Sequence, residues 1–141
     1  MARTTVPLDP SIFKAYDVRG IYPEQLDESV AAAVVAALCT RWPRGSVVIG
    51  RDARRSSPAL YRAAVRAAKT RAGKGRVIAA GLMTTPLFYF LVTHLRAAGG
   101  VMITASHNPK EYNGIKAVGA NADPISGTEL LRLVSASRFV A

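Results

Sequence analysis

Apolar and polar positions alternate in blocks along the chain, as in proteins where strands and helices follow one another. Short apolar runs at 46–50, 76–80 and 101–104 predict buried strands. Between them, apolar residues recur at helical spacing, which predicts helices from about Asp27 to Trp42, from Ser57 to about Arg71 and from Thr85 to about Arg96. The pattern therefore predicts an α/β fold class.

Residues that cap or break helices mark the predicted ends. Ser57 before Pro58, and Thr84-Thr85 before Pro86, suit a capping residue followed by proline in the first turn. Pro43, Gly73 and the pair Gly99-Gly100 are expected to end the three helices.

The remaining segments are less regular. Residues 12–16 could form a short strand, and 17–20 is interpreted as a turn or loop in which Gly20 is free to take a positive φ. Asn113-Gly114 predicts a tight turn, followed by a strand at 114–118, a loop at 119–127 and a helix from about Thr128 to Ser137.

These elements predict a three-layer α/β/α sandwich with a mostly parallel (mixed) sheet of about four strands, in a single domain over residues 1–141. Such sheets bind ligands in loops beyond the C-terminal ends of their strands. Ser106 follows one predicted strand by two residues, and Arg51 follows another directly.

Composition narrows the class of protein. Half of the residues are hydrophobic, which argues against a disordered chain, and a single cysteine, Cys39, excludes an internal disulfide framework. Cys39 with His94 and His107 is too small a set for structural zinc. The longest apolar run, Val30 to Cys39, is too short to cross a bilayer, and the N-terminus lacks a signal-peptide core. We expect a cytoplasmic protein with no membrane partner.

The formal net charge of +10 is concentrated in one region. Of the 19 Lys and Arg residues, 11 lie between Arg41 and Arg76, where Asp52 is the one acidic residue. Such a field attracts anions, among them nucleic acids and phosphorylated metabolites, although a solvated helix face explains most of these charges. Because no nucleic-acid motif is present and aromatic residues do not interleave with the basic cluster, no nucleic-acid partner is expected.

The loop from Thr104 to Lys116 carries the best candidates for chemistry. It brings a hydroxyl (Ser106), an imidazole (His107) and an ammonium (Lys116) into one segment, which suits a nucleophile with cationic and proton-transfer help. A hydrolase is disfavoured because adjacent side chains in an extended segment point to opposite sides, and because a Gly-x-Ser-x-Gly elbow is missing. Neither a Walker-type phosphate loop nor a Gly-x-Gly-x-x-Gly fingerprint is present.

Four motifs in order resemble the α-D-phosphohexomutases. Thr-Ala-Ser-His-Asn-Pro at 104–109 with Asn-Gly-Ile-Lys at 113–116 is similar to that family's active-serine signature. Tyr-Asp-Val-Arg-Gly at 16–20, Gly-Arg-Asp at 50–52 with Ser-Ser-Pro at 56–58, and Thr-Pro at 85–86 after Gly81 agree as well. Tyr112 before Asn113 resembles the phosphomannomutase/phosphoglucomutase branch, with phosphoglucosamine mutase as second choice.

The resemblance implies a role for each matching residue. Ser106 would be the phosphoserine that gives its phosphoryl group to a hexose monophosphate and takes one back from the bisphosphorylated sugar. Lys116 and Arg19 would stabilise the transferring phosphoryl group, and His107 would act as general acid or base. Tyr16 and Asn108 would contact the substrate. Arg51 and Asp52 are expected to form an internal ion pair that braces the sheet, instead of acting on the substrate.

The resemblance covers only the first of the family's four domains. It implies Mg²⁺ bound through the phosphate of Ser106 and a hexose 1,6-bisphosphate as activator, but the acidic loop of domain 2 that completes the metal site is not in this sequence. The expected partners are a hexose phosphate and the missing domains 2–4. We therefore expect a fragment inactive alone; the alternative is a non-catalytic phosphosugar-binding or interaction module.

Overall fold

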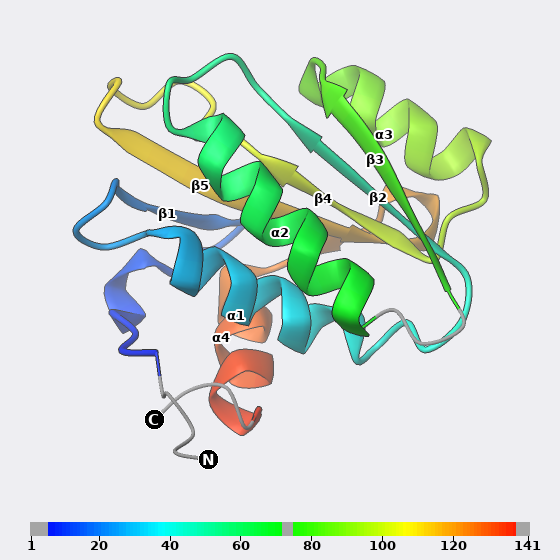
Figure 1. Cartoon of the computed structure of the whole chain (residues 1–141), viewed down its shortest axis with the longest axis horizontal. Helices are drawn as coiled ribbons and strands as arrows, with labels where there is room; N and C mark the ends of the chain where they lie inside the picture. The colour runs from blue at the N-terminus through cyan, green and yellow to red at the C-terminus, as the bar shows by residue number, and fades with distance from the viewer. Residues whose placement is uncertain (1–5, 72–74, 138–141) are drawn as a thin grey trace.

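The computed structural model describes residues 6–71 and 75–137. In these residues a short 3₁₀ turn, η1 (Pro10–Ile12), precedes a succession of strands and helices, and a second one, η2 (Ala120–Ala122), lies between β5 and β6 (Figure 1). The elements are, in order, β1 (Val18–Ile21), α1 (Glu28–Cys39), β2 (Ser46–Arg51), α2 (Ser57–Arg71), β3 (Arg76–Leu82), α3 (Thr85–His94), β4 (Gly99–Ile103), β5 (Tyr112–Gly119), β6 (Pro124–Ile125) and α4 (Gly127–Ala136).

The strands form one mixed sheet in the order β1-β5-β4-β2-β3, with β6 paired to β5. β2 is parallel to both β3 and β4, whereas β5 is antiparallel to β4, β1 and β6. The α/β class and the mixed sheet are confirmed, with six strands instead of about four. The two extra strands are the short β1 and β6, which flank β5 and whose apolar runs are too brief to stand out in the sequence.

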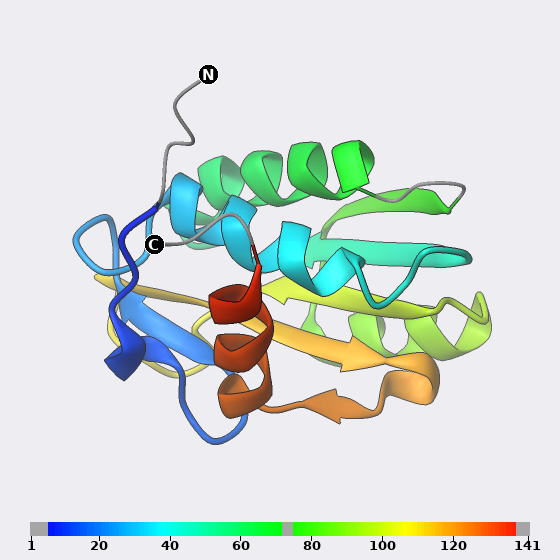
Figure 2. The same cartoon turned by 90° about the horizontal axis from the view of Figure 1, so that it is seen from below.

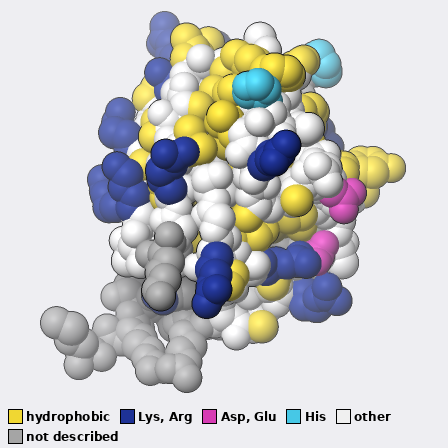
Figure 3. Space-filling model, turned by 90° about the vertical axis from the view of Figure 1, so that its right-hand side faces the viewer, with side chains coloured by type: hydrophobic (Ala, Val, Ile, Leu, Met, Phe, Trp, Pro, Cys, Tyr) yellow, Lys and Arg dark blue, Asp and Glu magenta, His cyan; other side chains and the backbone are white. Residues whose placement is uncertain are grey.

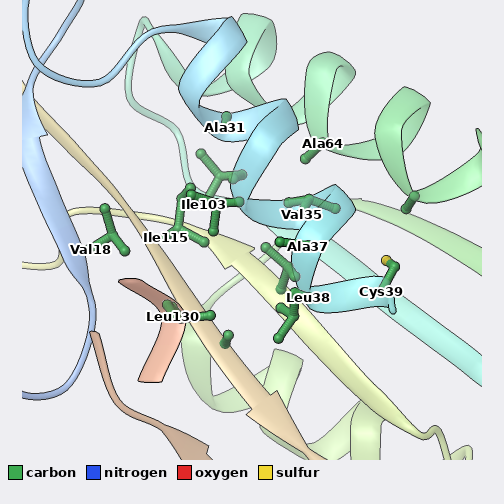
Figure 4. Close-up of a cluster of buried hydrophobic side chains, with 14 of the residues drawn as sticks. Val18, Ala31, Val35, Ala37, Leu38, Cys39, Ala64, Ile103, Ile115 and Leu130 are labelled. Carbon is green, nitrogen blue, oxygen red and sulfur yellow. The ribbon is translucent and has the colours of Figure 1, made fainter. Parts of the chain in front are cut away.

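Helices cover both faces of the sheet, as Figure 2 shows: α1, α2 and α4 lie on one side and α3 on the other. The larger core lies under α1, where Val35 and Leu38 meet Ile103 and Ile115 of the sheet and Leu130 of α4 (Figure 4). A smaller core forms under α3 around Phe88 and Val92. This arrangement is the predicted three-layer sandwich.

Several predicted helix ends are confirmed at the level of hydrogen bonds. Asp27 caps α1 by accepting from the Val30 amide, and Thr84 caps α3 by accepting from the Leu87 amide. Ser57 behaves differently: it is the first residue of α2, and its hydroxyl donates to Asp52 Oδ1 at 2.5 Å. The prediction of Ser57 as a cap was wrong, because a carboxylate of the preceding loop takes its hydroxyl. The predicted end at Gly73 lies outside the described residues.

Two segments predicted as turns are strands. Residues 18–21 form β1, with Arg19 opposite Gly114 and Gly20 opposite Asn113, so Asn113-Gly114 also lies inside a strand, β5. Gly114 is needed there for close approach, since a Cβ would come within 2.5 Å of Val18 O and 2.6 Å of Thr104 O. Asn113-Gly114 is typical of a turn when the sequence is considered alone. In the sheet, Gly114 instead allows the backbones on either side to come close to β5.

Three further expectations are corrected. Gly99 and Gly100 begin β4 instead of ending α3, because the rings of Trp42 and Phe88 occupy the space beside them. β3 was predicted as a buried strand but lies at the edge of the sheet, with residues only partly buried or exposed. Residues 12–16 do not form a strand; the nearest feature is one bridge between Phe13 and Val18.

Apart from Tyr16, the exposed large hydrophobic side chains of the described residues belong to the end of β3 and to α3 and its C-terminal cap. They are Leu82, Leu87, Tyr89, Phe90 and Leu95. Figure 3 shows one face on which hydrophobic side chains gather in the upper part while Lys and Arg side chains are spread over the rest. Among the described residues, none of the helices combines the length and apolar character required to traverse a membrane.

Candidate active site

The serine loop, residues 104–111, connects β4 to β5. It lies at the end of the sheet where the parallel strands β2, β3 and β4 have their C-terminal ends. Thr104 and Ala105 are buried, but Ser106 is exposed and has a left-handed backbone with φ of 55°. Its amide donates to Thr104 Oγ1 at 3.0 Å. Left-handed backbone is uncommon for a non-glycine residue and is a reason to suspect a functional position.

Arg54, in the loop between β2 and α2, lies against the inside of the serine loop. Its guanidinium donates to the carbonyls of Ser106 (3.0 Å), Asn108 (2.6 Å), Pro109 (2.7 Å) and Tyr112 (3.1 Å). These four hydrogen bonds join the serine loop to the loop between β2 and α2, so two segments more than fifty residues apart in the chain act as one unit.

Asp52 is the anchor beneath this unit. Its Oδ1 accepts from the Arg54 amide at 3.0 Å, its Oδ2 accepts from Thr104 Oγ1 at 2.8 Å, and Oδ2 lies 3.4 Å from Arg54 Nε. The expected ion pair between Arg51 and Asp52 is not formed: Arg51 Nη1 donates to the Asp52 carbonyl, while the carboxylate pairs with Arg54. Adjacent residues at a strand end diverge, so the i, i+2 partner is better placed.

An open pocket of about 810 Å³ adjoins Ser106. It is lined by Asp52, Ala53, Arg54, Arg55, Ser106, Asn108 and Lys110. Ser106, Asn108 and Lys110 alternate along the chain, while the exposed His107 between them does not line the pocket. The pocket combines a hydroxyl with three cationic side chains, a chemistry that suits an anion such as a phosphate group.

Arg19 and Lys116 form a second cationic group on the neighbouring strands. Arg19 Nε donates to Asp17 Oδ1 at 2.9 Å, and Lys116 Nζ lies 3.9 Å from Asp17 Oδ2. The Asp17 side chain is almost fully buried, whereas both cations are partly exposed. Two positive charges around one carboxylate leave a net positive charge at the surface.

The sheet fixes where this group stands relative to the serine loop. The Thr104 amide donates to the Gly114 carbonyl at 3.0 Å, and Gly114 is in register with Arg19, so the three residues form one row across β4, β5 and β1. Lys116 lies two residues further along β5, in register with Met102. Neither Arg19 nor Lys116 lines the pocket beside Ser106. The pocket of the serine loop and the second cationic group are therefore two separate places on the sheet.

The two predicted substrate contacts are placed differently. Asn108 Nδ2 donates to the Ala105 carbonyl at 2.9 Å, which shapes the loop, and Asn108 also lines the pocket. Tyr16 is 77% exposed in the turn before β1, and β1 begins at the end remote from Tyr112. Their substrate roles stay predictions.

Tyr22 borders the site from the other side. A neighbouring hollow that also involves Arg55 and Lys110 is lined by Tyr22, whose amide donates to the Glu111 carbonyl at 2.9 Å. Its phenol donates to Glu28 Oε1 at 2.8 Å, and this hydrogen bond, together with burial, raises the pKa of Tyr22. The phenol is thereby held as a proton donor to Glu28.

The described residues do not supply a magnesium site. Within 6–71 and 75–137, no group of three or more His, Cys, Asp or Glu is placed to hold a metal ion. Asp52, the carboxylate that lines the pocket beside Ser106, already accepts from Arg54, Ser57 and Thr104. Since a hard cation requires several oxygen ligands, these residues do not fit Mg²⁺ by themselves.

Sequence reasoning missed three residues of the site: Asp17, Arg54 and Thr104. Asp17 and Thr104 stand inside recognised motifs and Arg54 stands between two of them, but the role of each depends on the atoms that it meets across the fold. Arg54 stands in a run of basic residues where a solvated surface was the default interpretation. The one signal was the spacing Asp-x-Arg directly after a strand end.

The chain is similar in sequence to proteins of one family. Residues 10–137 match the family model described as phosphoglucomutase/phosphomannomutase, alpha/beta/alpha domain I. The chain is 50% identical over 114 residues to phosphohexose mutases of Xanthomonas campestris pv. campestris, which covers 81% of this chain and 25% of the relative. It is 38% identical over 136 residues to a phosphoglucomutase of Neisseria gonorrhoeae, covering 92% of this chain and 29% of the relative.

A solved structure shares the fold. A phosphoglucomutase/phosphomannomutase family protein from Burkholderia thailandensis superimposes with a TM-score of 0.81 at 30% identity, over 95% of this chain and 32% of that one. The chain therefore spans about a quarter to a third of the length of these relatives. A serine loop anchored at the strand ends, the family match over residues 10–137 and the shared fold lead to one conclusion: this chain belongs to the phosphoglucomutase/phosphomannomutase family and corresponds to its domain I.

Proposed function

We propose that Ser106 carries a phosphoryl group in the interconversion of hexose 1-phosphates and 6-phosphates, and that this chain is the donor domain of a phosphomannomutase/phosphoglucomutase that is inactive without its other domains. The observation that carries the proposal is the exposed, left-handed Ser106 at the mouth of a cationic pocket, in a loop held by Arg54. Ser106 lines this pocket whereas the adjacent His107 does not, which supports a hydroxyl on the pocket side.

The chemistry balances as two transfers. The P–O bond to Ser106 Oγ breaks as a hydroxyl of the hexose monophosphate forms a new P–O bond, and the proton of that hydroxyl passes through a base to the departing Ser106 Oγ. The bisphosphorylated sugar then reorients and returns its other phosphoryl group to Ser106 Oγ, whose proton passes through the same base to the departing sugar oxygen. Such transfers depend on positioning and on cationic stabilisation of the transferring group.

The other residues have separate roles in this proposal. His107, exposed next to Ser106, serves as the proton acceptor and donor. Arg19 and Lys116 hold phosphate oxygens. Because both cations contact the carboxylate of Asp17, that carboxylate keeps their side chains in position. Tyr16 and Asn108 contact the sugar phosphate. Mg²⁺ and hexose 1,6-bisphosphate remain predictions from the family resemblance.

A chimera tests the proposal. In it, this chain replaces the matching quarter of the Xanthomonas relative, and conversion of glucose 1-phosphate to glucose 6-phosphate is measured. We expect turnover with the native sequence and with Ser135→Ala, an exposed serine of α4, and loss of turnover with Ser106→Ala. Equal turnover with Ser106→Ala would refute the donor role. A folded chimera that has no activity would favour the non-catalytic binding module.

A further inference from the structure

Four of the five N–H groups of the Arg54 guanidinium donate hydrogen bonds, and the fifth, on Nε, belongs to an ion pair with Asp52. These four donate to carbonyls of the serine loop and the start of β5, and Nε lies 3.4 Å from Asp52 Oδ2. An arginine has five such donors and no more, so none is left for a ligand. The Arg54 side chain is 16% exposed, so it lines the pocket while its N–H groups are directed at the loop and at Asp52.

We propose that Arg54 is a positioning residue: it sets the backbone conformation of Ser106 and thereby the position of its hydroxyl, and it does not bind the phosphate itself. The inference rests on the proposed function for its catalytic consequence, but its structural part can be tested alone. The inference assigns this role to Arg54 and not to Arg55, an adjacent residue of the same charge that lines the same pocket with an exposed side chain.

The loop requires such a partner because its carbonyls converge. The oxygens of Ser106, Asn108, Pro109 and Tyr112 all point to one place, where they would repel one another if no donor were present. Two of the loop's own amides bond locally, Asn108 to the Ala105 carbonyl and Tyr112 to the Pro109 carbonyl. These local bonds do not hold the Ser106 carbonyl, which in the described structure accepts from Arg54.

Ser106 is the residue whose conformation depends most on this contact. Its amide is fixed by Thr104 Oγ1 and its carbonyl by Arg54 Nη2, so both ends of the residue are held at φ of 55°. Left-handed backbone is disfavoured for L-residues outside glycine and persists where the surroundings impose it. Asp52 links the two restraints, since it accepts from both Thr104 and Arg54.

Only a planar, forked donor fits this arrangement. An ammonium group has three N–H donors on one atom and cannot reach four carbonyls and a carboxylate together. Lysine at position 54 would therefore preserve the charge of the pocket but not the conformation of the loop. This difference distinguishes positioning by shape from a general electrostatic effect.

The test uses isotope-labelled protein of the full chain and NMR spectroscopy. In the native protein we expect separate, slowly exchanging Nη proton signals for Arg54, since its guanidinium is held on all sides, and averaged signals for Arg55. The ¹³Cα and ¹³Cβ shifts of Ser106 should report left-handed backbone. Averaged Nη signals for Arg54 in the native protein would overturn the inference without any variant.

Three variants sharpen the result. With Arg54→Ala and Arg54→Lys, we expect the Ser106 shifts to leave the left-handed range, and amide exchange at Asn108 and Tyr112 to rise at least about tenfold, while amides of β2 and β4 keep their protection. Arg55→Ala removes the same charge and should leave both readouts unchanged. Native-like Ser106 shifts in Arg54→Lys would overturn the inference, because charge alone would then suffice.

A kinetic readout connects the loop to the reaction. In the chimera, Arg54→Lys should lower kcat roughly a hundredfold with KM within about threefold of the native value, since misplacing a reacting group affects the chemical step. A raised KM with unchanged kcat would show that Arg54 binds substrate and would overturn the inference. If the chimera remains fully active with Ser106→Ala, the proposed function fails, while the NMR result still decides the structural role of Arg54.

Discussion

Asp17 Oδ1 accepts a hydrogen bond of 2.9 Å from Arg19 Nε, across a side-chain pair in which the carboxylate is buried and the guanidinium is partly exposed. The same carboxylate lies 3.9 Å from Lys116 Nζ on β5. One buried acid thus fixes two cations that face the same side of the sheet. Its charge offsets the repulsion between Arg19 and Lys116.

Replacing this acid should loosen both cations. Asp17→Asn retains the size of the side chain but leaves Arg19 and Lys116 to repel each other, so we expect a loss of about 1–2 kcal/mol in the free energy of unfolding. Urea denaturation would measure it. Asp123→Asn, at an exposed position, is the control and should change stability by less than about 0.5 kcal/mol. Equal stability of both variants would contradict the role given to Asp17.

Gly114 should not tolerate a side chain. In Gly114→Ala the added Cβ would lie 2.5 Å from Val18 O and 2.6 Å from Thr104 O, so the strands must separate, at a cost of about 1–3 kcal/mol. Gly119→Ala, on the same strand, meets no atom nearer than 3.9 Å and should be tolerated. Thermal unfolding of the pair tests the prediction, which would be wrong if both variants melted at the native temperature.

The Thr104 hydroxyl should matter more than its methyl group. Thr104→Val leaves the Ser106 amide and Asp52 Oδ2 each short of one hydrogen bond in a buried position, with an expected cost of about 1–3 kcal/mol. Thr104→Ser restores the hydroxyl and should recover most of the loss. Chemical denaturation compares the three proteins; a valine variant as stable as the serine variant would show that these bonds contribute little.

Cys39 should make stability depend on alkaline pH. Burial raises the pKa of its thiol from an ordinary 9.0 to about 11. Above pH 9 the unfolded chain therefore releases a proton that the folded protein still holds. The contribution of this thiol to the free energy of unfolding is complete below pH 9. It is lost as the pH rises through 11, by up to about 1.4 kcal/mol per pH unit.

Comparison with Cys39→Ala isolates this effect, because Tyr22, whose pKa is also raised, contributes a loss of the same sign in both proteins. We expect the alanine variant to be less stable at neutral pH, through lost packing, but to lose less stability between pH 9 and 11. Urea titrations at a series of pH values measure both slopes. Parallel curves would mean that the thiol does not titrate differently in the two states.

The sequence alone determined the layers and the place of the serine loop in them. Apolar runs and capping residues such as Asp27 and Thr84 fix where helices and strands occur, because burial of apolar surface and satisfaction of the first helical amides are local requirements. Ser106 was singled out by the resemblance of its motif to the phosphohexomutases, and its place directly after a buried strand predicted its position at the end of the sheet.

Only the tertiary structure decided which residues meet. Gly114 resembled a turn residue until β1 and β4 were placed on either side of β5, and Arg54 resembled a surface charge until four carbonyls of a loop more than fifty residues away converged on it. Close approach of backbones and convergence of carbonyls are properties of segments distant in the chain, and no local pattern records them. The sequence therefore located the serine, and the fold determined how it is held.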